Sequence, residues 1–263
     1  MAQANSDATQ NTFNITSSSI TNLVGSGSIQ YNEAFENPDE TEDHKKVILF
    51  LASQPTSTAR LRLDVEIREI EAGLKRSRYR DRFNLKQRWA VRPSDLRQAL
   101  LDYRPYIVHF AGHGQGQSTV APASEETRKF IPMNQSSTLE EGLILEDQTG
   151  QAKVVSTEAL ADLFKLFADS IECVILNACY SERQASAIAQ HIPYVIGMNQ
   201  AIGDRTAIEF AIGFYDALGV GESIEFAYEL ARNAIQLAGI PGNAIPVIYR
   251  GNISTQHSRT RLD

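Results

Sequence analysis

"YIVHFAGHG", residues 106–114, is an apolar run that stops at a histidine between two glycines. A short, continuously apolar run is typical of a strand that is covered on both faces of a parallel sheet. His113 follows where this strand ends, between Gly112 and Gly114. Since open α/β sheets bind ligands at the carboxyl ends of their strands, the stretch predicts a histidine at that edge of a sheet.

A second apolar run, "ECVILN" at residues 172–177, ends just before Ala178 and Cys179. The interval between the two runs has room for a loop, a hairpin and one crossover helix. We therefore expect the two strands to be neighbours, with His113 and Cys179 facing each other at the same edge.

The remaining pattern alternates strands with helices, which indicates an α/β fold with a mostly parallel sheet. The further expected strands are 47–52, 83–91, 194–198 and 245–249, with a hairpin over 142–156 that turns at 148–150. The expected helices are 61–74, 94–103, 157–168, 181–190, 204–218 and 223–238. The helix at 181 opens with Ser181 and Gln184, which have the spacing of a capping box.

Composition excludes several function classes. The chain has 263 residues, of which 42% are hydrophobic, and a formal net charge of −7, which disfavours a nucleic-acid-binding module. No apolar run is long enough to span a membrane, and the N-terminus lacks the basic and apolar stretches of a secretion signal. We expect a cytoplasmic protein with two reduced cysteines and no metal site or cofactor, because no metal-ligand spacing is present.

Two segments differ from the rest. Residues 1–44 contain no lysine or arginine and are rich in Asn, Ser and Thr, so they read either as a disordered tail or as a self-associating, β-prone segment. Residues 45–263 form the expected folded domain. Residues 115–141 read as a long polar loop. It is a plain flexible insertion, a cover for the site, or a segment that is cleaved at the Arg128–Lys129 pair.

A histidine and a cysteine at one sheet edge suit acyl transfer. The thiolate is the nucleophile, and an imidazole can take the thiol proton and return one to the leaving amine. The start of the helix after Cys179 favours negative charge on sulfur, and the amides of Gly114 and Cys179 are candidate oxyanion donors. Taken singly, His113 reads equally well as a loop residue and Cys179 as a small buried thiol; Cys173 and His109 read as core residues.

The combination of "HFAGHG" and "VILNACYS" resembles the caspase-like cysteine peptidases, and most closely their CHAT-domain branch. "YVIGMNQAIGD" and the final "IPVIYRG" are also similar to that branch, so the resemblance covers about Lys45 to Gly251. It implies a caspase-like, six-stranded sheet between helices, with His113 as general base and acid and Cys179 as nucleophile. It also implies an oxyanion hole from the Gly114 and Cys179 amides.

The resemblance leaves substrate preference open. By analogy with separases, Asp204 is a candidate carboxylate for binding basic substrate side chains, and its alternative role is to cap the following helix. Glu146 and Asp147 are further candidates for substrate binding, or solvated residues of the hairpin. Arg183 and Arg205 would instead favour acidic substrates; we expect basic or broad specificity.

Two functions follow as hypotheses. The first is a cysteine endopeptidase that cleaves a protein substrate, as a regulated effector in bacterial defence or cell-death signalling, switched on by a sensor or regulatory protein. The second is a non-catalytic, caspase-like scaffold that assembles through residues 1–44.

Overall fold

The main sheet follows the apolar runs of the sequence. A computed structural model describes residues 45–116 and 141–251, so the expectations for residues 1–44 and for Arg128 and Lys129 lie outside the described residues. Six strands pair in the order β2-β1-β3-β7-β8-β9. They are β1 (Lys46–Ala52), β2 (Phe83–Arg88), β3 (Ile107–Ala111), β7 (Cys173–Asn177), β8 (Tyr194–Met198) and β9 (Pro246–Arg250). All neighbours are parallel except β8 and β9, which confirms the predicted α/β, mostly parallel fold.

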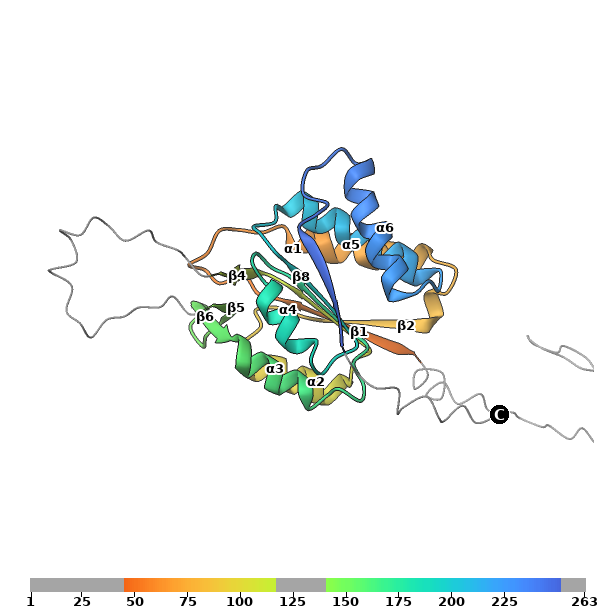
Figure 1. The fold of residues 1–263 in the computed structure, drawn as a ribbon. Helices are drawn as coiled ribbons and strands as arrows, with labels where there is room; N and C mark the ends of the chain where they lie inside the picture. Colours follow the sequence, from red (N-terminus) through yellow and green to blue (C-terminus); the bar gives the residue numbers. More distant parts are fainter. Residues whose placement is uncertain (1–44, 117–140, 252–263) are drawn as a thin grey trace, which may run out of the picture. The chain divides into compact units, whose positions relative to one another are not determined.

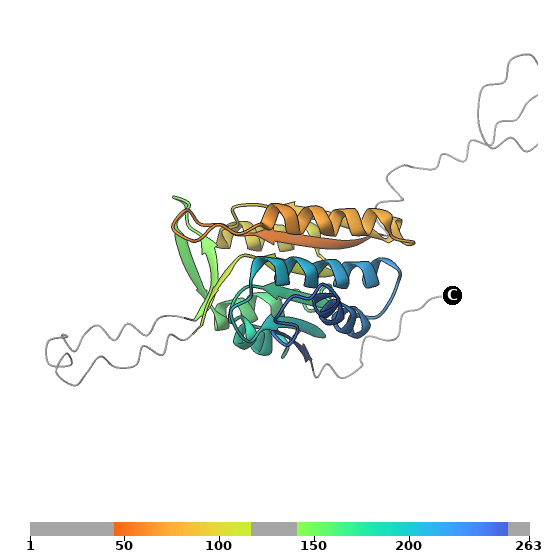
Figure 2. The same cartoon turned by 90° about the horizontal axis from the view of Figure 1, so that it is seen from above.

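Helices cover both faces of this sheet (Figures 1 and 2). One face carries α1 (Leu63–Arg76), α5 (Asp204–Gly219) and α6 (Ile224–Leu237); the other carries α2 (Pro93–Tyr103), α3 (Thr157–Lys165) and α4 (Glu182–Ile188). A short 3-10 turn, Arg80–Arg82, precedes β2. Within the described residues, no helix is both long and apolar enough to cross a membrane.

Local sequence signals explain where several helices begin. Pro93 is the first residue of α2, a position where the missing N–H costs nothing. Ser156 and Ser223 cap α3 and α6, because their hydroxyls accept hydrogen bonds from the amides of Ala159 and Phe226 at 3.3 and 3.2 Å.

The alternation of side chains along the strands divides the core into two apolar layers. Phe50, Ile175 and Phe214 are fully buried in the layer under α1, α5 and α6. Val108 and Leu176 are fully buried in the layer under α2, α3 and α4. Since β1, β3 and β7 contribute to both layers, they are mostly apolar on both faces, as in parallel strands covered on two sides.

A second, antiparallel sheet stands at one end of the main sheet (Figures 1 and 2). It consists of β4 (His113–Gln115), β5 (Gly142–Glu146) and β6 (Ala152–Ser156). The predicted hairpin over 142–156 is confirmed as β5 and β6. The expectation of a loop from residue 115 is wrong at its start, because Gln115 is the last residue of β4 and pairs with Gly142 of β5.

A buried polar network crosses the layer under α1 and α5. Glu66 Oε1 lies 2.8 Å from His109 Nε2 and accepts a hydrogen bond from Asn177 Nδ2 at 2.7 Å. The Tyr215 hydroxyl lies 3.1 Å from His109 Nδ1. Burial, with Cys173 and Glu66 nearby, raises the pKa of Tyr215 well above its usual range, so its hydroxyl keeps the proton.

This network holds the core histidine at both ring nitrogens. The Glu66 carboxylate oxygen accepts the hydrogen bond from His109 Nε2, and Nδ1 shares a second hydrogen bond with the Tyr215 hydroxyl. His109 is thus a core histidine, as predicted, and its polar partners are what the apolar pattern did not reveal. All of these groups are buried, so each depends on the others for its hydrogen bonds.

We predict that Glu66→Leu lowers the free energy of unfolding by about 3 kcal/mol, because it leaves His109 Nε2 without an acceptor and removes one from Asn177. Glu66→Gln retains an acceptor oxygen and loses less. Urea denaturation measures both, with Glu69→Leu on the same helix as a surface control. A loss no greater in Glu66→Leu than in Glu69→Leu contradicts this assignment.

Candidate active site

The two strands that end in His113 and Cys179 are neighbours. β3 and β7 pair in parallel, and the last partners in register are Ala111 and Asn177. His113 and Cys179 each follow two residues beyond this last pair. The prediction that these strands lie side by side, with their carboxyl ends at one edge, is confirmed.

Gly112 is the point where the chain leaves the main sheet. Its N–H donates to the Asn177 carbonyl at 3.3 Å, and the next residue, His113, already pairs with Ile144 of β5. A Cβ at position 112 would lie 2.9 Å from the Ser53 carbonyl oxygen. Only glycine allows the crossing this close to β1, because any other residue would displace the backbone.

The backbone of β4 is packed directly against the turn that carries Cys179. A Cβ on Gly114 would lie 2.2 Å from the Cys179 carbonyl oxygen, and one on Gly116 would lie 2.8 Å from Tyr180 Cβ. Contacts this close exclude a side chain at either glycine. The glycines therefore bring the segment that bears His113 against the segment that bears Cys179.

His113 is held by the loop between β1 and α1. Its Nε2 lies 2.8 Å from the Ala59 carbonyl oxygen. A carbonyl only accepts, so the ring proton is on Nε2, and Nδ1 is the nitrogen that is free to accept a proton. His113 is partly buried.

The Cys179 sulfur contacts the segment that follows β8. The Ile202 N–H donates to Sγ at 3.4 Å, and the Ile202 carbonyl lies 3.7 Å from Sγ. The next residue, Tyr180, has a φ of 56°, a left-handed conformation that is rare for a bulky side chain. This sharp turn is held by the Tyr180 N–H, which donates to the Gln200 carbonyl at 3.2 Å.

The expected capping box at Ser181 is wrong. Ser181 precedes α4, but its hydroxyl donates to the Leu176 carbonyl at 2.8 Å and accepts from the Met198 N–H at 2.9 Å. The buried hydroxyl thus joins β7 to β8 beyond their last paired residues, Ile175 and Ile196. The Ser181 hydroxyl is therefore not used to cap α4. Instead it ties the turn after Cys179 to the ends of β7 and β8.

The Cys179 amide is available to a ligand. It donates no hydrogen bond to the described part of the chain, whereas its neighbours Ala178 and Tyr180 each donate to a backbone carbonyl. α4 begins at Glu182, three residues after Cys179. The oxyanion role of the Gly114 and Cys179 amides stays a prediction.

Asp204 is close in sequence to the residue that touches the sulfur. It is the first residue of α5, two positions after Ile202, and the cap position is occupied by Gly203. Asp204 is half-buried and makes no hydrogen bond or ion pair within residues 45–116 and 141–251. Arg205 is exposed, and Arg183 is bound to Glu141.

Glu146 and Asp147 are engaged elsewhere. Glu146 is buried, and its carboxylate accepts from the Gln54 N–H at 3.1 Å. This contact is on the β1 side of β3, whereas Cys179 follows β7 on the other side. Asp147 accepts from Thr149 and Gln151 within the hairpin turn, and these bonds, the Thr149 hydroxyl first, lower its pKa. Their substrate-binding roles stay predictions.

The structure places Cys173 in the core, as predicted. Cys173 is fully buried at the start of β7, and burial raises the pKa of its thiol. It is therefore an inert core thiol. Among the residues that the structure describes, no three His, Cys, Asp or Glu side chains gather as metal ligands.

The chain is similar in sequence to known proteins. A family model described as "CHAT domain" matches residues 8–240, which begins well before Lys45, the start expected from the motifs. A "Roc-COR-CHAT protease" from an unknown prokaryotic organism is 25% identical over 227 residues, covering 84% of this chain and 19% of the relative. A "Probable protease" of Gillisia limnaea (strain DSM 15749 / LMG 21470 / R-8282) is 22% identical over 154 residues, covering 58% and 23%.

The chain spans about a fifth of the length of these curated relatives. Among solved structures, a secreted C11 cysteine protease from Bacteroides thetaiotaomicron, iotapain, is similar at 13% sequence identity. The superposition has a TM-score of 0.46 and covers 72% of this chain and 62% of iotapain.

The two cysteines are expected to differ in reactivity. We predict that iodoacetamide alkylates Cys179 in the folded protein and leaves Cys173 unmodified, because Cys173 is fully buried with a raised pKa. Mass spectrometry of native and urea-unfolded protein measures this, with Cys179→Ala as the control. Alkylation of Cys173 at a comparable rate in the native protein contradicts the prediction.

Proposed function

This chain belongs to the CHAT domain family, and from that premise we propose that it is a cysteine endopeptidase using Cys179 and His113. The observation that carries the proposal is the contact between β4 and the Cys179 turn, where Gly114 leaves no room for a Cβ. This contact supports the proposal because it brings the segment that bears His113 against the segment that bears Cys179. The names of two matched relatives, both proteases, support the same activity.

In the proposed mechanism, His113 accepts the Cys179 proton at Nδ1, since Nε2 is bound to the Ala59 carbonyl. The Ile202 N–H donates to the sulfur and so helps to hold it in place. The thiolate attacks the peptide carbonyl, and the amides of Cys179 and Gly114 stabilise the oxyanion; within the described residues the Cys179 amide donates to no other group. The protonated histidine then gives its proton to the leaving amine, and water releases the acyl group from the sulfur.

Asp204 supports a preference for basic substrate side chains. Its carboxylate is unpaired within the described residues and follows Ile202, which contacts the sulfur. A substrate side chain beside the attacked carbonyl would lie near this segment. Of the competing cations, Arg183 is less suited, because it is already bound to Glu141.

We further propose that the enzyme is a regulated effector in bacterial defence or cell-death signalling that acts on a protein substrate. The name "Roc-COR-CHAT protease" joins a CHAT protease to other parts, and this chain matches only 19% of that relative. Such a combination supports control of the peptidase by a sensor or regulatory protein.

We predict that a peptidyl acyloxymethyl ketone labels Cys179, and that Cys179→Ala abolishes the labelling. His113→Ala should slow it at least 100-fold, because general acid–base catalysis contributes about 10²–10⁴-fold. Gel and mass-spectrometric detection of the adduct measures both, and peptides ending in Arg, Lys, Leu or Asp test turnover. If His113→Ala is labelled as fast as the wild-type chain, or if the wild-type chain is not labelled at all, the result favours the non-catalytic scaffold.

We predict that Asp204→Asn lowers kcat/KM for peptides ending in Arg or Lys by about 10- to 100-fold, the effect of losing a charge-assisted hydrogen bond. Peptides ending in Leu should be cleaved as before. The labelling rates of matched Arg and Leu probes give the same ratio. Asp216→Asn, on the exposed side of α5, is the control. An equal loss for Arg and Leu substrates contradicts a pocket role.

A further inference from the structure

The carbonyl that binds His113 has a second donor. Ala59 O lies 2.8 Å from His113 Nε2 and also accepts a hydrogen bond from Gln54 Nε2 at 2.8 Å. Ala59 lies in an exposed loop before α1, where a lone carbonyl has no fixed direction. The Gln54 amide therefore supplies the restraint that the loop itself lacks.

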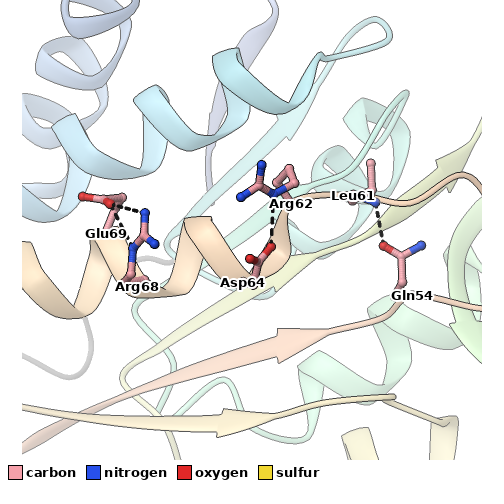
Figure 3. A network of polar contacts seen from close by, with 6 residues as sticks. All are labelled: Gln54, Leu61, Arg62, Asp64, Arg68 and Glu69. Carbon is pink, nitrogen blue, oxygen red and sulfur yellow. Dashed lines mark hydrogen bonds and ion pairs between the residues drawn. The ribbon is translucent and has the colours of Figure 1, made fainter.

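Gln54 holds this loop on both sides of Ala59. Its Oε1 accepts from the Leu61 N–H at 2.8 Å, and its Nε2 lies 3.4 Å from Thr58 Oγ1. Figure 3 shows the amide reaching from the end of β1 to the backbone before α1. One side chain thus satisfies an acceptor and a donor of the same short loop.

The backbone of Gln54 is itself anchored to the sheet that carries His113. The Gln54 N–H donates to the Glu146 carboxylate at 3.1 Å, and Glu146 is the last residue of β5. β5 also pairs with His113 through Ile144. The contacts form a closed ring, in which β5 holds His113 directly and holds the acceptor of His113 through Gln54.

We propose that Gln54 is a positioning residue that orients the His113 ring toward Cys179 by holding the Ala59 carbonyl, with Glu146 as its anchor. This inference rests on the proposed roles of His113 and Cys179. When His113 gains a proton during the reaction, its Nε2–H becomes a charged donor, and the hydrogen bond to Ala59 strengthens. A fixed acceptor is then most useful, because it needs no reorganisation.

Two substitutions separate this role from a merely structural one. Gln54→Glu keeps an acceptor for the Leu61 N–H but has no donor for Ala59, whereas Gln54→Met loses both. We expect both variants to lower the maximal rate of Cys179 labelling about 10- to 100-fold, with little change in probe affinity. Gln98→Met, on the exposed face of α2, is the matched control. A full rate in Gln54→Glu contradicts the proposal.

A second measurement does not require catalysis. In the full chain carrying Cys179→Ala, ¹⁵N NMR should detect a downfield Nε2–H proton of His113, assigned by its loss in His113→Ala. Adding Gln54→Glu or Gln54→Met should broaden it through exchange with water, while Gln98→Met leaves it intact. An unchanged signal in both Gln54 variants, or none in the parent, overturns the inference. Failure of the proposed function would instead appear as unlabelled Cys179 in the wild-type chain.

Discussion

One carboxylate oxygen joins the elements on which the rest of this fold depends. Glu66 Oε1 binds both His109 of β3 and Asn177 of β7, and it is carried by α1, which packs over both strands. Because the site is buried, a shift of α1 would leave several polar groups without partners. The strands that lead to His113 and Cys179 are therefore held by a polar contact within an apolar layer, at the middle of β3 and at the last residue of β7.

Much of the fold was predictable because its signals are local. A few neighbouring residues are enough to predict the strands β1, β3 and β7 from their apolar runs, and the helix α1 from its apolar spacing. β4 was missed because three residues that begin at His113 and contain a glycine have no strand pattern of their own. Such a strand exists only because β5, far along the chain, pairs with it.

The candidate site shows the same division. Strand ends identified His113 and Cys179, and the structure makes their strands neighbours. The local pattern at Ser181 indicated a helix cap, but Met198 binds its hydroxyl instead. The sequence suggested a substrate-binding or solvated role for Glu146, because its partner, Gln54, lies 92 positions away. When a side chain binds a backbone group that is distant in the sequence, the residues around it do not predict the contact.

His113 and Cys179 belong to different sheets. The cysteine follows the buried main sheet, and the histidine begins a three-stranded sheet, with Gly112 as the one residue between β3 and β4 in the chain. The alignment of the pair is thus a property of how two sheets dock, and neither strand determines it alone. The geometry between the two side chains depends on the contact between both sheets. Leu143 and Leu145 of β5 are buried in the layer under α2, α3 and α4, so the sheet that carries His113 is itself continuous with the core, and a change in packing there reaches the histidine.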